Sequence, residues 1–145
     1  SVTALDLSVK ASHSELLAVL DDLQGAGKIQ LPVAGLVTPS ASGYSIIQGI
    51  TTKTISELME SIQRWIPVAC YGLLSVDDEG VFASDEMKLW PILAMYGDKD
   101  LLGKRSSEFL QTHSGATVQE HSGMHSFYLS SPESFVEAVF SFLKE

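Results

Sequence analysis

The segment Leu31–Ser45 (LPVAGLVTPSASGYS) contains an apolar run that stops abruptly at small residues. Its stretch Val33–Thr38 is almost wholly apolar and has no helical spacing, which is typical of a buried strand in a parallel sheet. The residues Pro39–Gly43 are small, and such a run lets the backbone turn from a strand directly into a helix. We therefore expect the Ser40 hydroxyl at the apex of a strand-to-helix turn, where it is presented to an acyl substrate. The alternative is a simple loop rich in helix-capping residues.

The rest of the chain alternates between strand-like and helix-like patterns. The expected strands are Val2–Leu7, Val33–Thr38, Pro67–Leu74, Ile92–Tyr96 and Thr117–His121. Three helices are expected after start signals, namely the capping boxes at Ser12 and Thr54 and the Ser131-Pro132 pair. Three more are expected at Gly43–Ile50, Ser84–Trp90 and Lys104–Thr112. This alternation predicts an α/β fold, with a mostly parallel sheet that helices cover on both faces. In such sheets the functional site lies at the carboxyl ends of the strands.

Two later segments place chemically useful side chains at such ends. Asp98 and Asp100 follow the strand that ends at Tyr96, and His125 lies in a loop after the strand that ends at His121. Serine, acid and histidine in this chain order are the order found on α/β-hydrolase sheets. A neutral imidazole can take the proton of a hydroxyl, and a carboxylate can fix its tautomer and stabilise the imidazolium.

Two of these roles have competitors. Asp98 competes with Asp100 for the role of the acid. His121 competes with His125 for the role of the base, but His121 lies within the predicted strand, whereas a loop can carry His125 across to the serine. A metal site formed by the two histidines is disfavoured, because Gly123 and the loop context argue against a helix between them. We expect no metal and no cofactor.

Length and composition limit the number of domains, the kinds of partner and the cellular location that we expect. The 145 residues suit one domain, 1–145, large enough to bury a core without disulfides, and the formal net charge of −9 argues against a nucleic-acid or anionic-membrane partner. No apolar run approaches the ~20 residues of a membrane span, and the start of the chain lacks the pattern of a signal peptide. The single cysteine, Cys70, has apolar neighbours that favour a buried thiol, and we expect a cytoplasmic location.

Four motifs carry a resemblance to a known family. They are the elbow Thr38–Gly43 (TPSASG), the acid strand Pro91–Asp100 (PILAMYGDKD), the histidine loop Ser122–Leu129 (SGMHSFYL), and Pro132-Glu133 with Phe142-Leu143 in the last helix. With these motifs, the segment from Pro32 onward resembles the α/β-hydrolase superfamily, and within it the ABHD14-like proteins (CCG1-interacting factor B type). The elbow of those proteins is similarly S-P-S-x-S-G.

The resemblance implies a role for each residue of the candidate site. Ser40 would be the nucleophile, Asp100 the acid that orients the base, and His125 the general base and then the general acid. The family places its acid at the fourth position of Gly-Asp-x-Asp, which favours Asp100 over Asp98. The backbone N–H of Ala41 would supply one oxyanion donor. The implied function is that of a serine hydrolase or acyl-transferring esterase, which acts on a small-molecule acyl substrate through an acyl-serine intermediate.

The N-terminal part departs from the family pattern. Val2–Leu7 resembles the family's fourth strand, and the first three strands and the His-Gly loop have no counterpart in this sequence. That loop normally supplies a second oxyanion N–H, and the loss of one such donor typically costs about 10²–10³ in rate. We expect a fragment or shortened form of a larger hydrolase, or a reduced version whose sheet has closed up. The alternative function is a catalytically impaired α/β-hydrolase-fold protein that serves as an interaction module for a protein partner.

Overall fold

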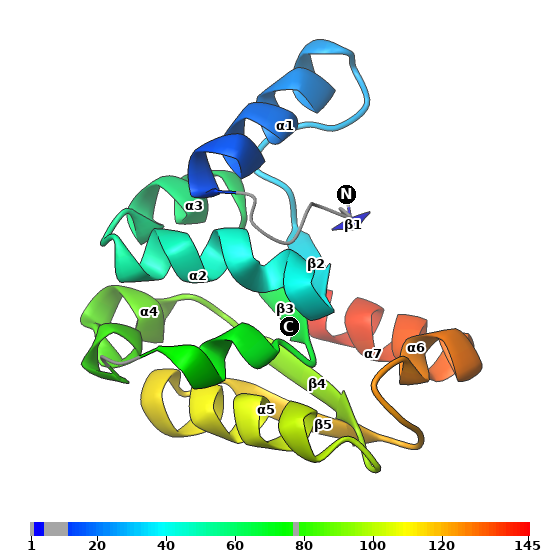
Figure 1. The fold of residues 1–145 in the computed structure, drawn as a ribbon. Helices are drawn as coiled ribbons and strands as arrows, with labels where there is room; N and C mark the ends of the chain where they lie inside the picture. The colour runs from blue at the N-terminus through cyan, green and yellow to red at the C-terminus, as the bar shows by residue number, and fades with distance from the viewer. Residues whose placement is uncertain (1, 5–11, 77–78) are drawn as a thin grey trace.

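A computed structural model describes residues 2–4, 12–76 and 79–145 (Figure 1). The strands are β1 (Val2–Ala4), β2 (Gly35–Pro39), β3 (Trp65–Val68), β4 (Leu93–Gly97) and β5 (Thr117–His121). The α-helices are α1 (His13–Gly25), α2 (Tyr44–Thr51), α3 (Ile55–Ser61), α4 (Asp85–Leu89), α5 (Leu101–Ser114), α6 (Phe127–Ser130) and α7 (Pro132–Leu143). Three short 3₁₀ helices join them: η1 (Ser40–Gly43), η2 (Tyr71–Ser75) and η3 (Glu79–Ala83).

The strands form one parallel sheet in chain order. The strands β2 to β5 make up its main part, and the three-residue β1 pairs with β2 at one edge. All of these pairings are parallel, so the carboxyl ends of the strands lie along one rim of the sheet. The predicted α/β class with a parallel sheet is therefore confirmed.

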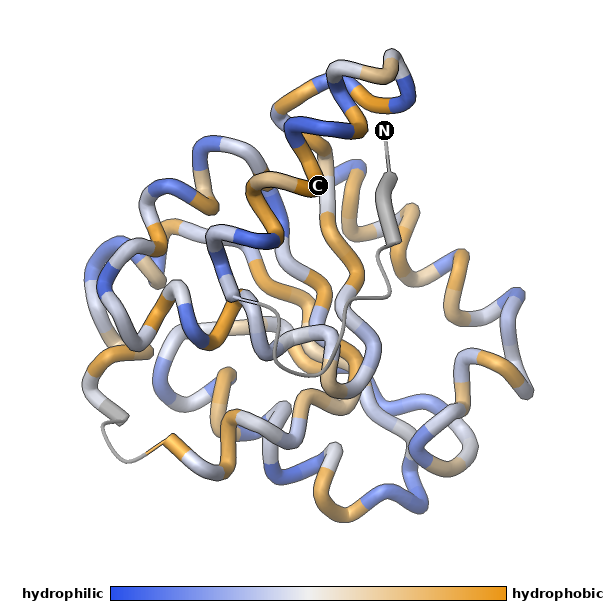
Figure 2. Tube along the Cα trace, turned by 45° about the horizontal axis from the view of Figure 1, so that its top comes forward, coloured by the Kyte–Doolittle hydropathy of each residue, from blue (hydrophilic) through white to orange (hydrophobic). Residues whose placement is uncertain are grey.

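Helices pack on both faces of this sheet, because successive strand residues point to opposite sides. On one face Leu36, Trp65 and Ala94 join a cluster with buried residues of α1 to α5. On the other face Val37, Ile66 and Met95 pack against α6 and α7, which lie across the sheet from α2 and α5 in Figure 1. Hydrophobic positions accordingly gather along the strands in the interior, and hydrophilic positions lie on the outward turns of the helices (Figure 2).

The strand predicted at Pro67–Leu74 is wrong in its bounds. The strand β3 begins at Trp65 and ends at Val68, after which Ala69 adopts a φ of 52° and η2 follows. Of the residues after Val68, Ala69, Cys70 and Leu73 are buried although they are not extended, whereas Leu74 is 41% exposed. A short apolar run does not distinguish a buried strand from buried residues that are not extended.

Several helix boundaries also differ from the prediction. The helix α5 begins at Leu101, three residues before the expected Lys104. Thr54 makes no side-chain cap, so its predicted capping box is wrong, and α3 ends at Ser61 and not near Arg64. By contrast, the Ser12 hydroxyl accepts the N–H of Glu15, as its capping box predicts.

The first strand and the histidine loop also differ from the prediction or are described only in part. The first strand is described at 2–4 only, and its predicted continuation to Leu7 lies outside the described residues. The loop expected at Ser122–Leu129 contains the start of α6. Among the residues that the structure describes, no helix combines the length and apolarity needed to cross a membrane.

Candidate active site

The elbow after β2 holds Ser40 in a strained backbone conformation. The strand ends at Pro39, and Ser40 has a φ of 54°, in the left-handed region that few residues other than glycine adopt. The chain continues at once into η1 and α2. A serine on such a strand-to-helix turn carries its hydroxyl at the end of the sheet, as the sequence predicts.

A close approach between Gly43 and Cys70 fixes the elbow against the end of β3. A Cβ atom at position 43 would lie 2.5 Å from the Cys70 sulfur and 3.4 Å from the Thr38 hydroxyl oxygen. A glycine is therefore required if the backbone after Ser40 is to pack this tightly on the neighbouring segment.

Ser40, His125 and Asp100 come together although they lie far apart in the sequence. The Ser40 Oγ is 3.0 Å from His125 Nε2, and His125 Nδ1 is 3.3 Å from Asp100 Oδ2. Since a carboxylate can only accept, Nδ1 carries the ring proton and Nε2 is left to accept the serine proton. The three residues predicted at the ends of separate strands thus form a connected chain of polar contacts.

Asp100 is held by the helix that it begins. It is the N-cap residue of α5, and its Oδ1 accepts the backbone N–H of Gly103 at 3.1 Å. Its side chain is buried, and a negative charge at a helix N-terminus is stabilised by the helix dipole. Gly103 lies so close that a Cβ atom there would be 2.5 Å from Asp100 Oδ2. The carboxylate therefore lies directly over the first turn of α5.

The loop that carries His125 is fastened to the turn after β4. The Gly123 N–H donates to the Asp98 carboxylate at 2.9 Å, and the Lys99 N–H donates to the Gly123 carbonyl at 2.9 Å. Gly97 completes the fit, because a Cβ atom at this position would overlap the carbonyl oxygens of Gly123 and Met124. Asp98 therefore anchors the loop, while Asp100 contacts the histidine.

His121, the competing base, takes a different position. Its ring stacks on Phe127 with centroids 4.8 Å apart and planes inclined by 16°. Its Nδ1 lies 3.4 Å from the Ser134 hydroxyl, and its Nε2 lies 3.3 Å from the Gln119 side-chain oxygen. Burial lowers the pKa of His121. These contacts place it against α6 and α7, and not beside the serine.

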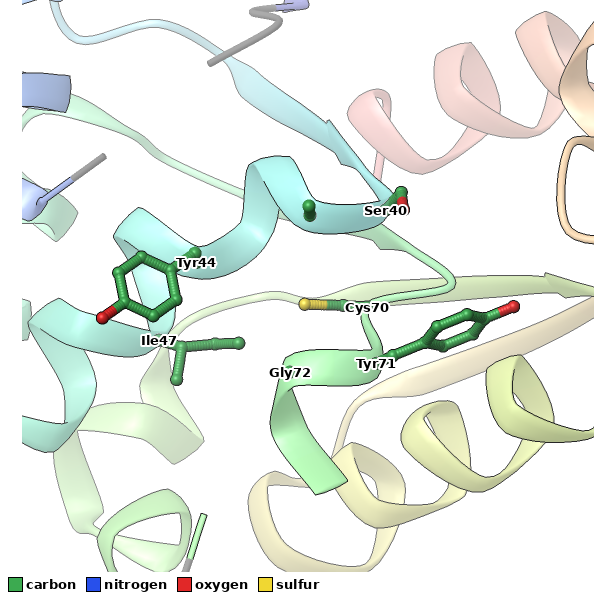
Figure 3. A pocket seen from close by; sticks show the side chains of 7 residues that line it. Ser40, Tyr44, Ile47, Cys70, Tyr71 and Gly72 are labelled. Carbon is green, nitrogen blue, oxygen red and sulfur yellow. The ribbon is translucent and has the colours of Figure 1, made fainter. Parts of the chain in front are cut away.

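A small cavity of about 220 Å³ opens beside the Ser40 hydroxyl. Its lining residues come from the elbow, from α2 and from the segment after β3, and are Ser40, Ala41, Tyr44, Ile47, Cys70, Tyr71 and Gly72. Figure 3 shows the hydroxyl ends of Ser40 and Tyr71 at one end of this cavity, with Tyr44 and Ile47 toward the other. The Ala41 N–H belongs to the first turn of η1, where helical N–H groups have no acceptor within the helix. It stays the predicted oxyanion donor.

Cys70 lines this cavity, and its thiol is a poor nucleophile. Burial raises the pKa of its thiol to about 12, although the backbone N–H groups of Gly72 and Leu73 favour the thiolate. The thiol is therefore protonated at neutral pH, and a protonated thiol is a weak nucleophile. The buried thiol predicted for Cys70 is confirmed.

Sequence reasoning missed Tyr71. Its hydroxyl donates to Asp100 Oδ1 at 2.6 Å, and its ring lies 4.7 Å from that of His125, measured between centroids. Within the apolar run that ends at Leu74, a tyrosine resembles one more core residue. The sequence gives no signal for this position, because the left-handed turn at Ala69 that ends the strand occurs at a residue that rarely adopts it.

The described parts of the chain, 2–4, 12–76 and 79–145, contain no group of three or more His, Cys, Asp or Glu side chains arranged to hold a metal ion. Comparison of the sequence with known protein families gives no match, and no curated protein matches it. What the site can do is therefore inferred from its residues and their geometry.

Proposed function

We propose that this protein is a serine hydrolase or acyl-transferring esterase of the α/β-hydrolase type. The observation that carries the proposal is the chain of contacts from Ser40 Oγ through His125 to Asp100, with distances of 3.0 and 3.3 Å. A serine, a histidine and a carboxylate in this arrangement form the unit that activates a hydroxyl for attack on a carbonyl carbon.

The proposed reaction has two halves. In the first, Ser40 Oγ attacks the carbonyl carbon of the substrate while its proton passes to His125 Nε2, and the Asp100 carboxylate stabilises the imidazolium. The Ala41 N–H donates to the oxyanion of the tetrahedral intermediate. The bond from carbonyl carbon to leaving group then breaks, and Nε2 returns the proton to the leaving group. An acyl-Ser40 ester is left.

In the second half, water or another acceptor attacks the acyl-Ser40 carbonyl. His125 Nε2 takes the proton of the attacking group, the tetrahedral intermediate collapses, and the proton passes to Ser40 Oγ as the ester bond breaks. Water as the acceptor gives a free acid, and another acceptor gives a transferred acyl group. Both outcomes regenerate the starting enzyme with no external cofactor.

The size and lining of the cavity beside Ser40 favour a substrate with a short, mostly apolar acyl group, which the cavity would hold. Its volume of about 220 Å³ is below the ~300–1,000 Å³ of pockets that take drug-sized ligands. Tyr44, Ile47 and Cys70 present mainly apolar surface to it. These apolar walls disfavour a strongly charged acyl group.

The test is covalent labelling with a fluorophosphonate, which reacts with activated serine hydroxyls. We expect labelling of the wild-type chain and its loss in Ser40→Ala. The matched control is Ser42→Ala, a buried serine of the same turn that is not part of the chain of contacts from Ser40 to Asp100. This variant should keep the label. A wild-type chain that takes up no label would contradict the proposal.

A second candidate is a catalytically impaired relative that binds a protein partner. It is favoured by the exposed apolar side chains of Leu129, Val136 and Phe140 on α6 and α7, and by the assignment of one oxyanion donor, at Ala41. Turnover of p-nitrophenyl acetate that is abolished in Ser40→Ala would reject this candidate.

A further inference from the structure

Tyr71 reaches the candidate site from a segment of the chain that contains none of Ser40, Asp100 and His125. It is the first residue of η2, two positions after the left-handed Ala69 at the end of β3. Its side chain points away from Tyr44 and Ile47, with the hydroxyl at its far end, as Figure 3 shows. The hydroxyl donates to Asp100 Oδ1 at 2.6 Å, a short distance typical of a hydroxyl on a carboxylate.

The donors around Asp100 divide between its two oxygens. Oδ1 accepts both the Tyr71 hydroxyl and the Gly103 N–H, and Oδ2 lies 3.3 Å from His125 Nδ1. Because Oδ1 is held by two donors from different elements, the carboxylate plane is fixed. The orientation that results is the one that presents Oδ2 to the imidazole.

The Tyr71 ring also limits where the imidazole of His125 can go. The two ring centroids are 4.7 Å apart with planes inclined by 42°. The His125 side chain is 36% exposed and lies on a loop, and the Tyr71 ring covers part of its surface. The tyrosine thus contacts both partners of the Asp100–His125 pair.

The phenol keeps its proton over the whole pH range in which esterases are assayed. Burial raises the pKa of Tyr71, and the hydrogen bond to Asp100 and the negative charge of Asp100 raise it further. The hydroxyl therefore stays a donor, as the contact with a carboxylate requires.

We propose that Tyr71 is a positioning residue for the reaction at Ser40: its hydroxyl holds the Asp100 carboxylate in the orientation that fixes the tautomer and the ring plane of His125. This inference rests on the proposed function. Tyr71 does not contact the reacting atoms in this proposal. The geometry of the Asp100–His125 pair instead depends on Tyr71, which lies 29 positions from Asp100 in the sequence.

The first test compares Tyr71→Phe with wild type in the turnover of p-nitrophenyl acetate. A lost hydrogen bond to a charged group should lower kcat by about tenfold, with KM within about twofold, because the acyl cavity keeps its shape. In the Asp100→Asn background the same substitution should have no further effect, since the tyrosine acts through that carboxylate. The matched control is Tyr128→Phe, which removes a phenolic hydroxyl from a ring that packs on Phe127 and Phe135.

The second test does not depend on activity. The Nδ1 proton of His125 should give a downfield proton NMR signal when it is held on Asp100, and this signal should broaden through faster exchange with water in Tyr71→Phe. In Tyr128→Phe it should stay unchanged. A tyrosine that served only the stability of the fold would lower the melting temperature and leave this signal as it is.

A further variant, Tyr71→Leu, separates the ring from the hydroxyl and serves in place of Tyr71→Phe if that chain does not fold. It should lose more activity than Tyr71→Phe, because the contact with the imidazole is lost as well. A folded Tyr71→Phe chain with wild-type kcat and an unchanged His125 signal would overturn the assignment of Tyr71 alone. A wild-type chain without turnover would instead reject the proposed function, and the NMR comparison would still show whether Tyr71 fixes the pair.

Discussion

The carboxylate of Asp98 accepts a hydrogen bond from the backbone N–H of Gly123 at 2.9 Å. Two residues further on, the carboxylate of Asp100 lies 3.3 Å from His125 Nδ1. The two acids that compete in the sequence therefore have separate tasks. Asp98 fastens the backbone of the histidine loop, and Asp100 faces the histidine ring.

These separate tasks predict different losses of activity. In Asp98→Ala the loop loses one tether but keeps the hydrogen bond from the Lys99 N–H to the Gly123 carbonyl. We therefore expect a fall of about tenfold in kcat/KM for p-nitrophenyl acetate, in line with one charged hydrogen bond. If Asp98→Ala were as inactive as Asp100→Asn, the assignment of the acid to Asp100 would be wrong.

Asp100→Asn separates the charge of this residue from its capping of α5. Asparagine caps helices about as well as aspartate, so the free energy of unfolding should stay within about 1 kcal/mol of wild type. Turnover should fall by about 10⁴, because the amide favours the wrong tautomer of His125. Urea unfolding and ester hydrolysis measured on the same preparation check both statements. A variant that kept most of its activity would exclude Asp100 from the reaction.

Gly97→Ala should lower the reactivity of Ser40 by displacing the backbone of the loop that carries His125. The added methyl group would overlap the carbonyl oxygens of Gly123 and Met124, so the loop that carries His125 must move. Since a misplacement of about 1 Å can cost about 10² in rate, we expect the rate of fluorophosphonate labelling to fall by about that factor.

The control for this variant is Gly25→Ala at the end of α1, where an added Cβ meets no atom within 4 Å. Its labelling rate should equal that of wild type. Equal labelling of Gly97→Ala would show that the loop adapts without moving the histidine.

Stability should decline in alkaline solution because of Cys70. Burial raises the pKa of this thiol from 9.0 to about 12, so between these values the folded chain keeps a proton that the unfolded chain releases. The stabilisation is complete below pH 9 and is lost as the pH rises toward 12, by at most about 1.4 kcal/mol per pH unit.

Urea unfolding at pH 8, 9, 10 and 11 measures this dependence. The slope should be smaller in Cys70→Ala, although burial also raises the pKa values of Tyr71 and Tyr96, which leave a residual decline. Parallel slopes for the two chains would show that the thiol does not couple to folding.

The elements that the sequence predicts well are those in which local pattern and burial agree. The strand β2 overlaps the predicted strand at 33–38, but it begins two residues later and ends one residue later, at Pro39. The elbow follows it because small residues allow the abrupt turn at Ser40. The helix α7 begins at Pro132, whose fixed φ suits a first helical position. The parallel arrangement of the strands puts Ser40 and Asp100 at one rim of the sheet, and the contacts of the loop after β5 with the turn after β4 bring His125 to them.

The elements that were mispredicted depend on contacts between distant segments. At the start of α5, Leu101 is 64% exposed, so its apolar character gives no amphipathic signal. The cap that begins this helix is Asp100, a residue interpreted only as an acid. Similarly, the position of Tyr71 depends on its contact with a carboxylate 29 residues away, and no periodicity within a short window records such a pairing.

The Asp100 carboxylate both caps the start of α5 and faces His125, so the first turn of this helix and the proposed catalytic centre depend on the same side chain. Terminal turns open locally at much lower free-energy cost than the whole domain. A brief opening of the first turn of α5 would turn Asp100 toward solvent while the sheet stays intact. Warming should therefore abolish fluorophosphonate labelling of Ser40 several degrees below the melting temperature of the fold, and cooling should restore the labelling without any refolding of the core.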